Sequence, residues 1–145
     1  MNGLTFSFAG PEEEARIREL LVASGLPDED VGSHLPHFIL ATSGALLVGC
    51  IGLELAGDSG LLRSLAVSPD FRSKGLGEEL CRRIEEYARG HGYRMLYLLT
   101  ISAAPYFQRR GYEPIDRSLA PEGIRRTEQF RSLCPSSAVL MRASL

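Results

Sequence analysis

The 145-residue sequence has few cysteines, no long apolar segment and little net charge, and each of these shortages excludes a class of protein. Its three cysteines, Cys50, Cys81 and Cys134, are odd in number and far apart, so they predict neither a disulfide framework nor a C-x-x-C metal site. No apolar run approaches the ~18 residues of a membrane-spanning helix, and Met1-Asn2-Gly3-Leu4 does not resemble a signal peptide. We therefore expect no membrane partner and a reducing, cytoplasmic location.

The balance of charge excludes a further class of partner. The sequence holds 16 lysines and arginines against 18 acidic residues, which gives a formal net charge of -2. A surface that binds nucleic acid is normally strongly basic, so we expect no nucleic acid partner. Hydrophobic residues make up 44% of the chain, enough for a packed core at this length. Because no internal repeat or linker divides them, residues 1–145 are expected to form one domain.

The central part of the chain predicts a strand, a glycine-rich turn and a helix. Residues 61–67 form an apolar run typical of a buried strand, and Pro69 ends it because proline cannot donate to a strand ladder. Apolar residues then recur at helical spacing, which predicts a helix over residues 76–89. The turn Arg72-Ser73-Lys74-Gly75-Leu76-Gly77 contains two glycines, which let a ligand approach the backbone closely. Since free N–H groups at a helix start bind anions, this turn predicts a phosphate site.

The spacing of the glycines narrows the choice of phosphate ligand. A dinucleotide-binding fingerprint needs a third glycine where this chain has Leu80. A Walker loop needs a lysine after its last glycine, whereas Lys74 precedes Gly75. The pattern that remains, Arg72-x-x-Gly75-x-Gly77, resembles the acetyl-CoA loop of the GNAT acetyltransferases. This resemblance implies acetyl-CoA as the cosubstrate.

The other elements complete a mixed α/β order. Apolar alternation and turn residues predict strands at residues 4–8, 37–42, 45–56, 93–100, 112–115 and 138–142. Helical spacing predicts helices at residues 11–24, 28–35, 103–110 and 121–133. Ion pairs four residues apart are expected along the helix at 76–89, namely Glu78 with Arg82, Glu79 with Arg83 and Glu85 with Arg89. A strand–helix–strand crossover makes residues 93–100 parallel to residues 61–67.

This order resembles the GNAT fold over essentially the full length of the chain. The fold implied is an α/β architecture with a mixed central sheet, antiparallel at its N-terminal side, a central parallel βαβ unit and helices on both faces. Ala104-Pro105-Tyr106-Phe107-Gln108-Arg109-Arg110-Gly111-Tyr112 resembles the family's A-x-x-x-Y/F-x-x-x-G-F/Y segment. A narrower resemblance, to GNAT proteins of arsenic-resistance clusters, rests on residues 52–54, 62–67, 97–100 and 133–138 and on the extra helix at 121–133.

The resemblance also implies how acetyl-CoA is held. In this family the strand before the loop separates from its parallel neighbour, and the pantetheine arm lies in the gap like an added strand. A backbone N–H of that strand would also stabilise the developing oxyanion. The implied cofactor-binding residues are Leu65, Ala66, Val67, Arg72, Ser73, Lys74, Gly75, Leu76, Gly77, Glu78, Thr100 and Phe107. Thr100 could instead cap the next helix.

A general acid for the leaving thiolate is not settled by the sequence. Many GNAT proteins place a tyrosine four residues before the glycine of the G-F/Y pair, and that position is Phe107 here. Its neighbour Tyr106, the candidate acid, points about 100° away around a helix. Three options stay open: Tyr106 reaches the thiolate, water protonates it, or no acid is needed. The last is reasonable because a thiol with a pKa near ~8.5 can leave as the anion.

Two charged residues interrupt apolar strands. Glu54 is the candidate general base, because a carboxylate buried among apolar residues becomes a stronger base. Arg63 could bind an acceptor carboxylate or oxyanion with two hydrogen bonds, and Ser64 could orient the amine. The alternatives are an outward, solvated Glu54 on a half-exposed strand, a structural ion pair of Arg63 with Glu54, and a structural role for Ser64.

No metal site is expected. His34 and His37 flank Pro36, so their rings need not converge, and no third ligand lies near them in the sequence. Cys134 precedes Pro135 and is a lone thiol, which makes a poor site for a soft metal.

The function favoured by these features is transfer of acetyl from acetyl-CoA to the primary amine of a small molecule, such as an amino acid-like toxic or arsenic-containing compound. One alternative is a catalytically idle sensor or partner protein that binds coenzyme A, which Phe107 keeps open. Another is an acetyltransferase of protein lysines. The expected partners are a small-molecule amine and, as an open option, a second copy of the chain. Fold alone does not identify the acceptor.

Overall fold

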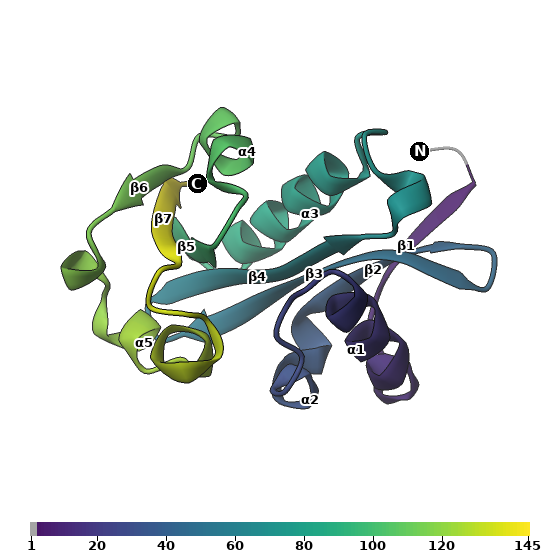
Figure 1. Cartoon of the computed structure of the whole chain (residues 1–145), viewed down its shortest axis with the longest axis horizontal. Coiled ribbons are helices and arrows are strands. Elements are labelled where there is room, and N and C mark those ends of the chain that lie inside the picture. The colour runs from purple at the N-terminus through teal and green to yellow at the C-terminus, as the bar shows by residue number, and fades with distance from the viewer. Residues whose placement is uncertain (1–2) are drawn as a thin grey trace.

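The computed structural model describes residues 3–145, which form one seven-stranded mixed sheet with helices on both faces (Figure 1). The strands are β1 (Leu4–Phe8), β2 (Phe38–Ser43), β3 (Leu46–Ala56), β4 (Ser59–Val67), β5 (Met95–Thr100), β6 (Glu113–Ile115) and β7 (Val139–Ser144). The helices are α1 (Glu14–Ala23), α2 (Val31–His34), α3 (Leu76–Gly90), α4 (Ala104–Arg109) and α5 (Glu122–Arg125). The strand order is β1-β2-β3-β4-β5-β7-β6, and only β4 and β5 pair in parallel. The predicted α/β fold is confirmed.

The side chains of β2 alternate between two hydrophobic cores, one on each face of the sheet. Successive side chains of a strand point to opposite faces. Ile39 and Ala41 therefore join the core beneath α3, whereas Phe38 and Leu40 join the core beneath α1 and α2. All four are at most 6% exposed. A third, smaller core lies under α5.

Helix α3 covers one face of the sheet because its apolar residues recur every four positions. Leu76, Leu80, Ile84 and Ala88 are each at most 2% exposed. The opposite side of the helix carries charged residues. Neither α3 nor any other helix within residues 3–145 is long and apolar enough to cross a lipid bilayer.

The ion pairs on α3 differ in part from those predicted. Arg83 pairs with Glu79 at 2.7 Å, as the spacing predicts. Arg82 was expected to pair with Glu78 but lies 2.6 Å from Glu79 and 2.9 Å from Glu86. Residues three and four apart are both neighbours on a helix, so spacing alone cannot choose between them.

The predicted pair of Glu85 with Arg89 is wrong. Glu85 instead accepts hydrogen bonds from Arg110 at 3.1 Å and from the Tyr112 hydroxyl at 2.9 Å. Arg110 directly follows α4 and Tyr112 lies two residues beyond it, 25 and 27 positions away from Glu85 in the sequence. The carboxylate thus joins α3 to α4.

Two predicted helices are shorter than expected. The helix predicted at 28–35 begins only at Val31 and ends at His34, and a 3-10 turn over Leu35–His37 follows. The helix predicted at 121–133 is interrupted after α5, and residues Gln129–Leu133 form a separate π-helical turn.

Thr127 explains the interruption. Its Oγ1 donates to the Ile124 carbonyl at 2.8 Å and accepts from the Phe130 N–H at 3.2 Å. Threonine hydroxyls that bond nearby backbone groups compete with the helix for them. The side chain therefore replaces helical backbone hydrogen bonds at this point.

The central parallel pair is short. Strands β4 and β5 pair only at Gly60 with Leu96 and at Leu61 with Tyr97. Beyond these residues the two strands diverge, as the resemblance to the GNAT fold implies, and their carboxyl ends leave a gap in the sheet.

Candidate active site

A β-bulge in β4 lies where that strand leaves its parallel neighbour. The register shifts between Cys50 and Gly52 on β3, so Ser64 and Leu65 of β4 together face a single residue. Ser64 has a φ of 59°, a left-handed conformation that is uncommon outside glycine. A bulge bends its strand and leaves the extra residue without a ladder partner. The Ser64 carbonyl accepts from the Cys50 thiol at 3.4 Å, and Ser64 and Leu65 have no register partner of their own on β3.

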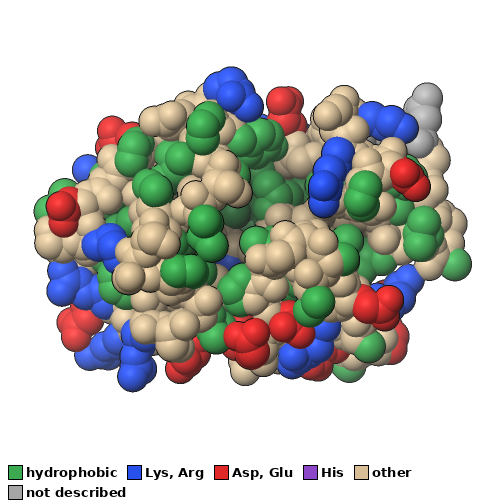
Figure 2. All heavy atoms as spheres, viewed as in Figure 1, with side chains coloured by type: hydrophobic (Ala, Val, Ile, Leu, Met, Phe, Trp, Pro, Cys, Tyr) green, Lys and Arg blue, Asp and Glu red, His purple; other side chains and the backbone are tan. Residues whose placement is uncertain are grey.

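A cavity of about 470 Å³ occupies the gap between the diverging strands. It is visible as a recess with hydrophobic side chains in the space-filling view (Figure 2). The lining residues are 24–27 after α1, 61–67 of β4, 98–103 at the end of β5, Arg72, Tyr106, Phe107, Gln129, Cys134 and Pro135. The cavity therefore receives residues from both halves of the sheet and from the segment after α5.

The glycine-rich turn before α3 has the geometry of an anion site. Gly75 precedes the helix with a φ of 84°, a conformation that favours glycine. A Cβ on Gly77 would lie 3.1 Å from the Tyr106 hydroxyl. The first N–H groups of this 15-residue helix have no intrahelical acceptor. A side chain at Gly77 would therefore crowd α4 at the point where α3 begins.

The other predicted cofactor residues occupy three settings. Leu65, Ala66 and Val67 line the cavity, Ser73, Lys74 and Glu78 are exposed in and after the turn, and Leu76 is buried in the core. Arg72 lines the cavity and donates to the Val67 carbonyl at 2.9 Å. Thr100 Oγ1 accepts from the Ala103 N–H at 3.0 Å in the turn that leads into α4, but the N-cap residue of that helix is Ala103, which has no side-chain cap bond. The hydroxyl proton of Thr100 remains available to a ligand.

The register of β3 and β4 brings Arg63 and Glu54 together. Arg63 pairs with Gly52, and Glu54 lies two residues along β3 on the same face, so the charged residues are diagonal neighbours. Arg63 Nη1 lies 3.1 Å from Glu54 Oε1, and the Arg63 side chain is only 1% exposed. The ion pair that the sequence left open as an alternative is therefore present.

Asp30, which precedes α2, is the main partner of Arg63. Its carboxylate oxygens lie 2.5 and 2.7 Å from the two Nη atoms, and Arg63 Nε donates to Ser64 Oγ at 3.1 Å. With the Glu54 contact, these bonds use four of the five N–H groups of the guanidinium. An acceptor carboxylate could bind Arg63 through two hydrogen bonds only if Asp30 moved away.

The pairing changes the acidity of Asp30. Burial by itself would raise the pKa of its carboxyl, but the hydrogen bonds and positive charge of Arg63 outweigh burial and hold that pKa below its usual range. Asp30 is therefore ionised at neutral pH, and the Arg63 guanidinium is matched by two carboxylates.

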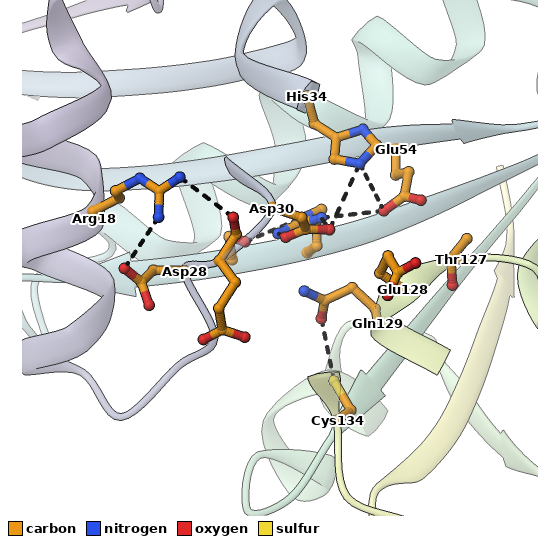
Figure 3. Close-up of polar contacts among 12 residues, drawn as sticks. Arg18, Asp28, Asp30, His34, Glu54, Thr127, Glu128, Gln129 and Cys134 are labelled. Carbon is orange, nitrogen blue, oxygen red and sulfur yellow. Dashed lines mark hydrogen bonds and ion pairs between the residues drawn. The ribbon is translucent and has the colours of Figure 1, made fainter. Parts of the chain in front are cut away.

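His34 joins this cluster, which the sequence did not predict. Its Nε2 lies 3.6 Å from an oxygen of Asp30 and 3.6 Å from an oxygen of Glu54 (Figure 3). Because one donor atom from each of the three residues lies within 4.8 Å of the others, the expectation that His34 has no further ligand nearby is wrong. His37 instead lies 2.7 Å from a tyrosine hydroxyl. Arg63 is a permanent cation at the same carboxylates, so it competes with a metal ion for them.

The two aromatic residues of α4 differ in their surroundings. Phe107 is 6% exposed, lines the cavity and packs edge-on against Tyr106 with ring centroids 5.2 Å apart. The Tyr106 hydroxyl is buried near Gly77 and has no hydrogen-bond partner within residues 3–145. Burial, and secondarily the Cys81 thiol, raises the pKa of Tyr106 well above its ordinary value. Tyr106 therefore stays neutral at physiological pH.

Sequence reasoning missed three residues at the site. Asp30 was interpreted only as part of a helix start, Gln129 fell inside a predicted helix, and Cys134 was judged as a lone thiol. Cys134 Sγ lies 3.1 Å from Gln129 Oε1, and burial raises the pKa of the thiol, which keeps it protonated. No local pattern marks these residues, because tertiary packing brings them to the site; Asp30 and Arg63 are 33 positions apart.

Comparison with known proteins identifies the class to which this fold and site belong. The model of the acetyltransferase (GNAT) family matches residues 4–112. The chain therefore belongs to the acetyltransferase (GNAT) family.

Curated relatives match part of the chain. The amino-acid acetyltransferase of Pseudomonas paraeruginosa (strain DSM 24068 / PA7) is 40% identical over 82 residues, which cover 55% of this chain and 19% of that protein. A protein of the same name from Azotobacter vinelandii (strain DJ / ATCC BAA-1303) is 40% identical over 80 residues, which cover 54% of this chain and 18% of that protein. The chain thus spans about a fifth of the length of these relatives.

Solved structures share the fold over nearly the whole chain. N-acetylglutamate synthase from Neisseria gonorrhoeae, complexed with coenzyme A and N-acetyl-glutamate, superposes with a TM-score of 0.84 at 24% identity, covering 98% of this chain and 35% of that chain. Rv2747 from Mycobacterium tuberculosis, in complex with CoA and NLQ, superposes with a TM-score of 0.80 at 20% identity, covering 97% and 99%. At these identities the likeness supports the fold, not the substrate.

Proposed function

We propose that the chain transfers an acetyl group from acetyl-CoA to the primary amine of a small molecule, with residues 1–145 acting as one domain. The observation that carries this proposal is the divergence of β4 from β5, which opens a cavity beside a glycine-rich helix start. A ligand with a long arm and a diphosphate fits both features at once.

In this proposal the backbone does most of the cofactor binding. The N–H groups of residues 73–78, with Arg72 beside them, hold the diphosphate, while residues 65–67 bond the pantetheine arm as an added strand would. Acetyl-CoA supplies the activated thioester. A backbone N–H freed by the bulge at Ser64 donates to the thioester oxygen, which gains negative charge in the transition state.

We propose Glu54 as the general base, acting through a water molecule. Its carboxylate lies behind Arg63, and Glu54 is not among the described residues that line the cavity. A proton from the amine therefore needs a relay to reach it. Arg63 and Ser64 line the cavity, which supports a role for them in orienting the acceptor.

An amino acid or amino acid-like amine is the acceptor class that we favour. The curated relatives named amino-acid acetyltransferase support this choice. The resemblance of residues 52–54, 62–67, 97–100 and 133–138 to proteins of arsenic-resistance clusters supports a finer proposal. In that proposal the acceptor is an arsenic- or phosphorus-containing analogue of glutamate.

The test combines binding with turnover. Isothermal titration with acetyl-CoA measures cofactor affinity, and a thiol-release assay measures transfer to a panel of L-amino acids, glutamate analogues and simple diamines. We expect binding of acetyl-CoA and faster release of coenzyme A with amino acids than with diamines. Release that no amine accelerates would refute the proposal.

A catalytically idle protein that binds coenzyme A is the second candidate. The observation that favours it is Phe107, a buried side chain without a titratable proton at the position where many family members carry a tyrosine. The same experiment separates the two functions, because an idle protein binds acetyl-CoA but does not consume it with any amine.

A further inference from the structure

One wall of the cavity contains a buried amide with an unused donor. Gln129 is 6% exposed and lines the cavity. Its Oε1 accepts a hydrogen bond from the Cys134 thiol at 3.1 Å, whereas its Nε2 has no partner within residues 3–145. Figure 3 shows the nitrogen of Gln129 turned away from Cys134, on the side of Asp30. The arrangement leaves two N–H groups without an acceptor.

An unused buried donor is unusual in a folded protein. Most buried polar side-chain atoms have a partner, because a buried donor without an acceptor destabilises the fold. The local backbone holds Gln129 in this position. The Cys134 N–H donates to the Gln129 carbonyl at 2.9 Å, the five-residue spacing of a π-turn, and such turns are frequent at functional sites.

The neighbouring polar groups of the cavity are also donors. Arg63 has one N–H group left after its four hydrogen bonds. Ser64 Oγ accepts from Arg63 Nε, so its own hydroxyl proton is free to donate. No aspartate or glutamate is among the described residues that line the cavity. A ligand rich in oxygen acceptors suits this wall better than a cationic chain.

We propose that Gln129 Nε2 donates a hydrogen bond to a carboxylate or other oxyanion oxygen of the acceptor and thereby determines acceptor specificity. Cys134 is a positioning residue: its protonated thiol holds Oε1 and turns the amide nitrogen toward the cavity. An amine that carries no such oxygen leaves the donor unpaired and is disfavoured. This inference rests on the proposed acetyl transfer and adds the group that the site recognises.

The decisive variant is Gln129→Met, which keeps the volume and removes the donor. With L-glutamate and L-glutamine as acceptors, we expect an increase of about tenfold or more in acceptor KM, as for other lost hydrogen bonds to a substrate. The kcat and the KM for acetyl-CoA should change less than about twofold. The melting temperature should stay the same or rise, because an unsatisfied buried amide is removed.

Further variants test whether the role of Gln129 is merely structural. Gln129→Glu, an isostere that only accepts and adds negative charge, should raise the acceptor KM more than Gln129→Met does. Cys134→Ala should raise the acceptor KM less than Gln129→Met does. Cys134→Ser keeps a hydrogen-bond donor, so its acceptor KM should stay close to the wild-type value. Activity with 1,4-diaminobutane, which has no oxygen, should be unchanged in Gln129→Met. The matched control is Gln108→Met, since Gln108 is an exposed glutamine on α4.

The outcomes separate this inference from the function on which it rests. A wild-type protein that transfers acetyl to amino acids while Gln129→Met keeps its acceptor KM overturns the inference alone. A wild-type protein that prefers 1,4-diaminobutane to amino acids also overturns it. A wild-type protein that transfers acetyl to no amine refutes the proposed function, and the inference with it.

Discussion

The guanidinium of Arg63 is held by two carboxylates. Asp30 binds it through both carboxylate oxygens, and Glu54 binds it through one. The Asp30 side chain is 12% exposed, so water screens the pair only partly. We expect Asp30→Asn to lower the free energy of unfolding by about 1–2 kcal/mol at pH 7. Urea denaturation of both proteins measures this difference.

The loss of stability caused by Asp30→Asn should be smaller at low pH than at neutral pH. The pKa of Asp30 is lowered in the fold, while in the unfolded chain an aspartate titrates near ~3.9. The stabilisation is therefore complete above about pH 4 and is lost as pH falls through the lower folded-state value. If the wild type and Asp30→Asn differ in free energy of unfolding by the same amount at pH 7 and at pH 3, the charge of Asp30 is not the cause of the stabilisation.

Glu54→Gln tests the proposed base. Because the amide keeps an oxygen for Arg63 and Asp30 remains in place, we expect a loss of only about 1–2 kcal/mol of stability. If Glu54 takes the amine proton, kcat should fall by about 10²-fold or more at temperatures where the protein stays folded. Asp30→Asn is the control, since it weakens the same ion pair without removing the base. A Glu54→Gln protein that loses stability but keeps its rate would establish a structural pair.

Tyr106→Phe tests whether a general acid is needed. The Tyr106 hydroxyl is buried, neutral and without a partner, and its raised pKa makes it a reluctant proton donor. We expect kcat to fall by less than about tenfold, below the ~10²–10⁴ of a true general acid. Initial rates at saturating substrate concentrations measure kcat. A thousandfold loss of kcat in a folded variant would identify Tyr106 as the acid.

At the scale of elements, the start of α3 is the feature on which cofactor binding depends. Gly77→Glu adds a side chain and a negative charge where a diphosphate is proposed to lie. We expect at least a hundredfold loss of acetyl-CoA affinity by isothermal titration, because bulk and like-charge repulsion act together. Gly90→Glu is the matched control, since Gly90 ends the same helix in open space. Equal affinity in the two variants would place the diphosphate elsewhere.

Elements also differ in how well the sequence predicts them. Helix α3 was predicted within one residue, because four core residues at a regular spacing determine it. The helix after Pro121 was predicted as continuous, yet Thr127 interrupts it with two side-chain hydrogen bonds. Propensity alone does not reveal which threonine will compete with its own backbone.

At the scale of the molecule, the sheet has two parts that are joined weakly at their centre. Strands β4 and β5 share two residue pairs, and the cavity replaces the rest of their ladder. A ligand that bonds to both strands should therefore stabilise the whole fold. At 100 times its dissociation constant, acetyl-CoA should add about 2.7 kcal/mol to the free energy of unfolding. Thermal unfolding with and without acetyl-CoA checks this, and Gly77→Glu should show no shift.

The sequence by itself determined the fold class and predicted the helix start at which we propose that an anion binds. Periodicity fixes strands and helices because burial of one face is a local property of spacing. The turn from Arg72 to Gly77 predicts its own geometry, since positive φ and free helical N–H groups arise within a few residues. These features depend on neighbours in the chain, so a single sequence suffices to find them.

The tertiary structure alone decided which side chains meet at the end of the cavity where we propose that the acceptor binds. Asp30 reaches Arg63 because α2 packs over the face of β3 and β4 on which Glu54 also lies. Gln129 reaches the cavity because the helix after α5 breaks and a π-turn follows. Charge partners and donor placement depend on strand register and on contacts between distant segments. Spacing along the chain does not encode these distances, because they result from packing the whole core.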